Sequence, residues 1–194
     1  TVHVSPDTVR YMNSHVNSQL NGQATDTHAL PAGNWRLDPD RTTITVTAKK
    51  LGAFAVPATL AMSAGTVDIA ADHRVTGVEV VADAGSYTSR NAKRNDHIRS
   101  ADFLDADHHP DLVFTAEQVR QAADGYEAAG SVTVKGESFP LDVDISNVEF
   151  DADRGSFVAT ATIDRNAIGV GKLPSLVIGR NIELTVAATA VLDV

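Results

Sequence analysis

The stretch Ile182-Glu183-Leu184-Thr185-Val186-Ala187-Ala188-Thr189-Ala190-Val191-Leu192 decides the fold. Apolar residues occupy every second position from Ile182 to Leu192, so they face one side of an extended chain. Such alternation predicts a β-strand with one dry face and one wet face.

The same period of two recurs upstream and predicts about eight strands, or about nine with Trp35–Leu37. The upstream segments that carry this pattern are Thr43–Ala48, Ala53–Ala61, Gly65–Ala71, Val75–Ala84, Asp111–Val119, Gly130–Val134, Leu141–Ser146 and Phe157–Ile163. Short turn signals between apolar runs indicate antiparallel hairpins, at Ala123-Asp124-Gly125, Lys135-Gly136 and Asp153-Arg154-Gly155. No long helix alternates with the strands, and open strand edges need protection, so we predict an all-β fold closed into an antiparallel barrel over residues 34–194.

Residues 1–33 differ from the rest and are predicted to be a helical extension and linker. Ser5-Pro6-Asp7 is typical of a helix start, and Asn21-Gly22 of a helix stop. Val9, Met12, Val16 and Leu20 fall on one face between them. This helix is expected to dock on the barrel surface, or to act as a lid or a dimer contact.

One charged segment, Arg90–Asp107, interrupts the strands, and its Ala92–Ser100 part is predicted to form a short helical insertion. Arg94, Asp96, His97 and Arg99 then have two open interpretations. Ion pairs among them, and with Asp102, would fix the loop to the barrel end. Alternatively, some of these side chains face the polar head of a ligand.

Composition bounds the partners of the protein. The chain has 25 acidic and 16 basic residues among 194, a formal net charge of −9. This balance argues against nucleic-acid binding and against docking on anionic lipid. Without cysteine there is no disulfide or thiolate chemistry, and no apolar run is long enough for a membrane span. No signal peptide is visible, so we expect a soluble protein that is cytoplasmic, or periplasmic or secreted after processing.

Two kinds of reactive site were considered and are not predicted. His97, His108 and His109 lie near several aspartates, but their spacing does not place two histidines on one helical face as a metal site would. Ser100 lies between His97 and Asp102, but no Gly-x-Ser-x-Gly turn presents a nucleophile. We therefore expect no enzyme, no metal and no required cofactor.

The size of the inward residues leaves the barrel interior undecided. Several inward positions are small: Ala82, Ala159, Ala161, Ala188 and Ala190. Small residues leave a hollow lumen unless larger ones interdigitate, and an eight-stranded barrel stands at the boundary between filled and hollow. A hollow barrel would bind an apolar ligand, whereas a filled one would be a structural or protein-interaction module.

Arg94–Leu104 followed by His109–Phe114 resembles the signature of the YceI-like family, Arg-Asp-x-His-Leu-Arg-Ser-x-Asp-Phe and then Tyr-Pro-x-x-x-Phe. Further similar segments are Trp35–Asp38, Gly130–Gly136, Phe139–Leu141 and Ile163–Gly169. The resemblance implies a lipocalin-like barrel that binds isoprenoids, quinones or similar lipids for transport or storage, often as a homodimer and often in the periplasm. The chain departs from the family at Asn95, at Lys49-Lys50 in place of a usual histidine, and at Pro57, which suggests an edge or a bulge.

We expect the lipid tail to contact apolar side chains of the strands, the insertion and the loop before the last strand. These are Phe54, Val80, Ala82, Ile98, Phe103, Phe114, Ala159, Ala161, Ile168, Leu173, Leu176 and Ile178.

Overall fold

The computed structural model describes residues 29–51, 53–170 and 178–193. The predicted N-terminal helix lies outside the described residues. The strands are β1 Gly33–Leu37, β2 Thr43–Lys50, β3 Phe54–Ile69, β4 Val75–Ser89, β5 Asp111–Ala122, β6 Gly125–Val134, β7 Glu137–Phe150, β8 Arg154–Asp164 and β9 Ile178–Leu192. A short 3₁₀ turn, Pro39–Arg41, separates β1 from β2, and helix α2, Ala92–Arg99, follows β4.

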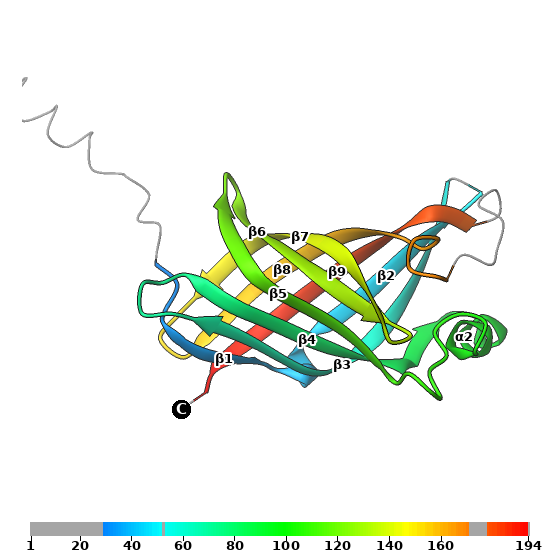
Figure 1. Cartoon of the computed structure of the whole chain (residues 1–194), viewed down its shortest axis with the longest axis horizontal. Coiled ribbons are helices and arrows are strands. Elements are labelled where there is room, and N and C mark those ends of the chain that lie inside the picture. The colour runs from blue at the N-terminus through cyan, green and yellow to red at the C-terminus, as the bar shows by residue number, and fades with distance from the viewer. Residues whose placement is uncertain (1–28, 52, 171–177, 194) are drawn as a thin grey trace, which may run out of the picture.

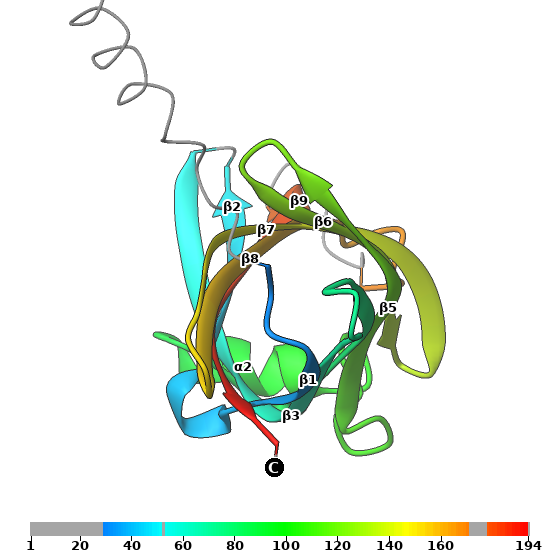
Figure 2. The ribbon, with the colours of Figure 1, turned by 90° about the vertical axis from the view of Figure 1, so that its left-hand side faces the viewer.

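The strands close into a ring, which Figure 2 shows end on. All pairings are antiparallel, and the pairing of β3 with β4 closes the sheet. Strands β1 and β2 both lie between β3 and β9, one after the other, so together they fill a single place in the ring. The prediction of a closed antiparallel barrel of about eight strands is confirmed.

Strand β3 corrects one detail of the prediction. The two strands expected at Ala53–Ala61 and Gly65–Ala71 are one continuous strand, whose pairing with β4 shifts register near Met62. These irregularities break the alternation, which is why the sequence suggested two strands. Pro57 pairs with Thr47 of β2. It precedes Ala58, the first residue of β3 that pairs with β4, so its missing N–H costs no hydrogen bond between β3 and β4.

Helix α2 covers one end of the barrel (Figure 1) and confirms the predicted helical insertion. The side chain of Asn91 caps it by accepting a hydrogen bond from the Arg94 backbone N–H at 3.0 Å. Two backbone bonds from the Ser100 N–H, to Asp96 and His97, end the helix. No helix within the described ranges is long and apolar enough to cross a membrane.

Large side chains pack together at the opposite end of the barrel, where β1 lies. Trp35 and Leu37 are each 1% exposed, and the Trp35 ring meets Phe150 edge-on with centroids 4.8 Å apart. Ala188 and Ala190, expected to leave space for a ligand, belong to this packed cluster instead. We call this the closed end, and the end covered by helix α2 the α2 end.

Candidate functional site

A cavity of about 510 Å³ runs along the inside of the barrel. Its lining extends along β4 from Val75 to Tyr87, which corresponds to roughly 30 Å along the axis at a typical strand rise and tilt. The other strands contribute Val, Leu, Ile, Ala and Phe side chains to the wall. The interior is therefore not filled along its whole length, and its surface suits a long hydrocarbon.

Polar side chains gather at the α2 end of this cavity. There the lining includes the end of β2, the end of β4, helix α2 and the residue after β8, with the side chains Lys50, Tyr87, Arg94, His97 and Arg165. Elsewhere the polar lining residues are Tyr126 and Thr160, and no Asp or Glu occurs among the lining residues that the structure describes. The cavity is thus an apolar tube with a cationic end.

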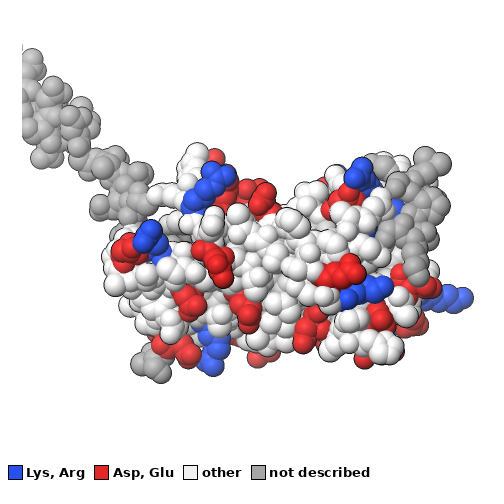
Figure 3. Space-filling view, in the orientation of Figure 1, with Lys and Arg blue, Asp and Glu red and all other residues white. Residues whose placement is uncertain are grey.

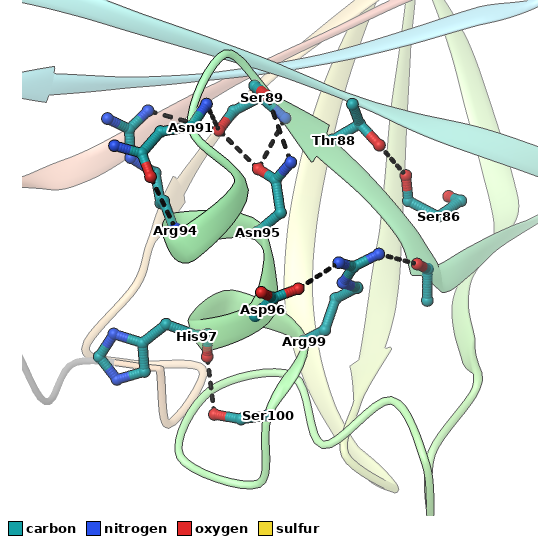
Figure 4. A network of polar contacts seen from close by, with 11 residues as sticks. Ser86, Thr88, Ser89, Asn91, Arg94, Asn95, Asp96, His97, Arg99 and Ser100 are labelled. Carbon is teal, nitrogen blue, oxygen red and sulfur yellow. Dashed lines mark hydrogen bonds and ion pairs between the residues drawn. The ribbon is translucent and has the colours of Figure 1, made fainter.

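Helix α2 separates its polar side chains between two faces (Figure 4). Arg94, His97 and Ile98, spaced three and four apart, line the cavity. Asp96 does not line it and forms an ion pair with Arg99 at 2.7 Å, and Arg99 also donates to the Gly85 carbonyl at 3.3 Å. Of the two interpretations, attachment of the loop to the barrel end therefore fits Asp96 and Arg99, whereas Arg94 and His97 reach the lumen.

Asn95 attaches α2 to the end of β4 (Figure 4). Its side-chain oxygen accepts from the Ser89 backbone N–H at 2.8 Å and from the Ser89 hydroxyl at 2.6 Å. Its side-chain nitrogen donates to the Ser89 carbonyl at 3.2 Å. A carboxylate could accept these bonds but could not donate the third, so the amide is specifically suited to this buried position.

Arg165 fixes the wall where β8 meets β9. It is only 3% exposed, and it donates from Nε to the Gly179 carbonyl and from Nη2 to the Ile178 carbonyl, each at 3.0 Å. Beside it Asp164 forms an ion pair with Arg180 at 2.6 Å, and the hydrogen bond from Arg180 lowers the pKa of the Asp164 carboxyl. This polar junction holds Ile178, a lining residue, in place.

Two aromatic contacts complete the α2 end. The His97 ring meets Phe103 edge-on with centroids 4.7 Å apart. Burial raises the pKa of the Tyr87 hydroxyl, while the nearby Arg94 charge acts in the opposite direction. Tyr87 therefore remains a protonated hydrogen-bond donor at neutral pH.

Most of the apolar residues expected to contact a ligand line the cavity: Val80, Ala82, Ile98, Phe103, Phe114, Ala159, Ile168 and Ile178. Ala161 packs against the interior cluster around Leu141 without lining the cavity. Phe54 is 66% exposed and does not line it, although its pairing partner Lys50 does. Leu173 and Leu176 lie outside the described residues.

Sequence reasoning missed four residues that build the α2 end: Lys50, Tyr87, Asn95 and Arg165. Signals for three of them were present. Lys50 is one of the two lysines that replace a family histidine, Asn95 is a departure from the family motif, and Arg165 lies within a matching segment. Nothing in the alternation pattern singles out Tyr87.

The groups considered for catalysis or metal binding are engaged elsewhere. The Ser100 hydroxyl donates to the His97 backbone carbonyl at 2.7 Å rather than to a histidine ring. The His108 ring bonds the Asp105 carboxylate at 2.8 Å. In the described ranges no three His, Cys, Asp or Glu side chains converge as a metal site requires.

Comparison with known proteins places this barrel among relatives. The chain is 32% identical over 91 residues to the UPF0312 protein ECA1782 of Pectobacterium atrosepticum, an alignment covering 44% of this chain and 47% of that protein. It is 30% identical over 104 residues to a UPF0312 protein of Vibrio cholerae, covering 49% and 53%. The chain thus spans about half the length of the curated relatives that it matches.

Two solved structures share the fold at low sequence identity. BcnA of Burkholderia cenocepacia superposes with a TM-score of 0.66 at 16% identity, covering 79% of this chain and 98% of that one. A polyisoprenoid-binding domain of Saccharophagus degradans superposes with a TM-score of 0.59 at 12% identity, covering 82% and 98%. The model of the YceI-like domain matches residues 35–190, so the chain belongs to the YceI-like family.

Proposed function

We propose that the barrel binds one long apolar molecule, of the isoprenoid or quinone type, and holds it away from water. The observation that carries the proposal is the continuous apolar cavity from the closed end to α2. Each buried CH₂ contributes roughly 0.8 kcal/mol, so ten buried carbons contribute on the order of 8 kcal/mol before the cost of ordering the chain.

The comparisons support this proposal at the level of the family. The chain has the YceI-like fold, and a structural neighbour is described as a polyisoprenoid-binding domain. Binding of this kind needs no reactive group, and the engaged Ser100 hydroxyl agrees with a role in transport or storage rather than catalysis. A homodimer stays a prediction from the family resemblance.

Plugging the lumen tests the proposal directly. Ala159 lines the cavity on β8, whereas Thr162 is exposed on the same strand and does not line it. We expect Ala159→Phe to lower the affinity for a long-tailed quinone at least tenfold, because the ring occupies space that the tail needs. Thr162→Phe adds the same ring to the outer face and is expected to bind like the wild type.

Two measurements check this expectation. Native mass spectrometry and solvent extraction of the purified wild-type protein should identify a co-purifying lipid, which Ala159→Phe should lack. Isothermal titration with the quinone gives the affinities, and circular dichroism verifies that both variants fold. Failure of the wild-type protein to bind any long apolar probe would overturn the proposal.

A further inference from the structure

We propose that the lumen selects amphiphiles with an anionic head group, a phosphate or a carboxylate, and that Arg94 and Lys50 bind this head at the α2 end. The inference rests on the proposed function, since it concerns the polar end of the same ligand.

The sign of the charge in the cavity carries the argument. The protein has more acidic than basic residues, and acidic side chains are spread over its outer face (Figure 3). Yet the described cavity lining contains Lys50, Arg94 and Arg165 and no carboxylate, and all three cations lie at the α2 end. A lining with the average composition of the chain would carry net negative charge. The positive charge of the observed lining therefore indicates an anionic ligand.

Arg94 is half-buried and has a weak local partner. Its Nη1 atom lies 3.4 Å from the Ser89 hydroxyl, a long and neutral contact. The nearest acidic neighbour in sequence, Asp96, is paired with Arg99 on another side of the helix. Within the part of the chain that the structure describes, Arg94 forms no ion pair, so most donors of its guanidinium remain available for a ligand.

Lys50 is placed by the register of β2. Lys49 faces outward and pairs with Glu183 at 2.8 Å, whereas Lys50 lines the cavity. Successive residues of a strand face opposite sides, so Lys49 pairs with a surface carboxylate, whereas Lys50, exposed at the end of β2, borders the mouth of the lumen. Lys49 is therefore a natural control for Lys50, with the same side chain on the same hairpin.

Neighbouring donors complete a site for an anion. Tyr87 and His97 line the same end of the cavity as Arg94. Neutral heads such as alcohols and quinones accept hydrogen bonds from these donors but gain little from the two cations. Because hydrogen bonds to charged partners are stronger than neutral ones, an anionic head should bind roughly ten- to a hundredfold more tightly than a neutral head on the same tail.

Titration with three probes of one chain length tests this selectivity. Geranylgeraniol is neutral, geranylgeranyl monophosphate carries a phosphate and geranylgeranoic acid carries a carboxylate. For the wild type we expect at least tenfold tighter binding of an anionic probe than of the alcohol, and the two anionic arms show which head is preferred. In Arg94→Gln and Lys50→Gln this preference should fall severalfold, because the anionic probes lose more affinity than the alcohol does; Lys49→Gln should keep the wild-type preference.

The outcomes separate this inference from the proposed function. Equal binding of all three probes by the wild type overturns the anionic head but leaves lumen binding intact. A preference that survives in Arg94→Gln, Lys50→Gln and the double variant overturns the assignment to these residues. Absence of binding for every probe overturns both proposals. Circular dichroism of each variant verifies folding.

Discussion

The two ends of the barrel are built from the same strands but in opposite ways. At the closed end Trp35, Leu37 and Phe150 pack against one another, and small residues such as Ala190 make room for them. At the α2 end the wall is lined by Lys50 and Arg94 and is covered by a short helix, whose Ile98 packs against a smaller core cluster that includes Phe103. From this difference we expect the closed end to contribute more to stability, and the α2 end to be where the proposed head group is bound.

The closed end shows how a β-barrel fills its own interior. Gly155 on β8 pairs with Phe150 on β7, and a Cβ atom at Gly155 would overlap the Phe150 ring. Large side chains from one strand therefore fit over small ones from its neighbour, which is the interdigitation that a packed core requires. The cavity nevertheless reaches this end, because Leu37 and Phe150 are part of its lining.

The largest effect is expected from Trp35→Ala. Trp35 is 1% exposed and contacts Phe150, so removing its ring leaves a cavity and should lower the free energy of unfolding by about 3–5 kcal/mol. Urea unfolding followed by circular dichroism measures the change, because Trp35 is the sole tryptophan and its fluorescence is lost in the variant.

A matched change at the other end gives the control for Trp35→Ala. Leu51, at the tip of the β2–β3 hairpin, is 59% exposed. Leu51→Ala should change the free energy of unfolding by less than about 0.5 kcal/mol. Comparable losses in both variants would contradict the idea that stability is concentrated at the closed end.

A smaller effect is expected from Asn95→Ala at the α2 end. The substitution removes all three hydrogen bonds to Ser89 and leaves polar backbone groups without those partners, at a cost of about 1–3 kcal/mol. Limited proteolysis should also cut the α2 region faster, because the helix loses its attachment to β4.

Asp96→Ala is the comparison for Asn95→Ala, since it alters the next residue of the same helix. The Asp96 side chain is 74% exposed and forms its ion pair with Arg99, so its removal should cost less than about 1 kcal/mol. If Asp96→Ala proved as destabilising as Asn95→Ala, the attachment through Ser89 would not be what holds the helix.

The sequence could predict the barrel because alternation is a local signal, repeated in nearly every strand. It could not decide whether the lumen is hollow, since that depends on which side chains meet across strands. Ala159 lines the cavity, but Ala188, equally small and also inward, is covered by the closed-end cluster. Local pattern alone did not distinguish these two alanines.

The candidate site was predictable only in part, for a similar reason. The spacing of Arg94, His97 and Ile98 places them on one helical face, but it does not show which face of the helix meets the barrel. Lys49 and Lys50 are identical in type, and only the register of β2 decides which one faces the lumen. Phe54 has the chemistry of a tail contact, yet it is 66% exposed at the start of β3 and does not line the cavity.

The smallest predicted effect concerns pH and belongs to the loop that follows α2. A hydrogen bond from His108 lowers the pKa of Asp105, and the same bond, with the charges of Asp105 and Asp107, raises the pKa of His108 above its usual 6.5. The raised His108 pKa stabilises the fold below about pH 6.5 and loses this effect as pH rises through the folded value. The lowered Asp105 pKa stabilises it above about pH 3.8 and loses this effect on further acidification.

His108→Gln tests this pair within the window between those two titrations. We expect the variant to melt slightly lower than the wild type at about pH 5, by a difference that shrinks as pH rises through the folded pKa of His108. The shift should be smaller than that of Asn95→Ala, because the His108 side chain is 76% exposed and water screens the pair. Trp35→Ala, which removes packing and no charge, should lower stability similarly at both pH values. A His108→Gln effect that did not change with pH would mean that His108 acts by packing. Charge would then not contribute to the difference between the two ends of the barrel.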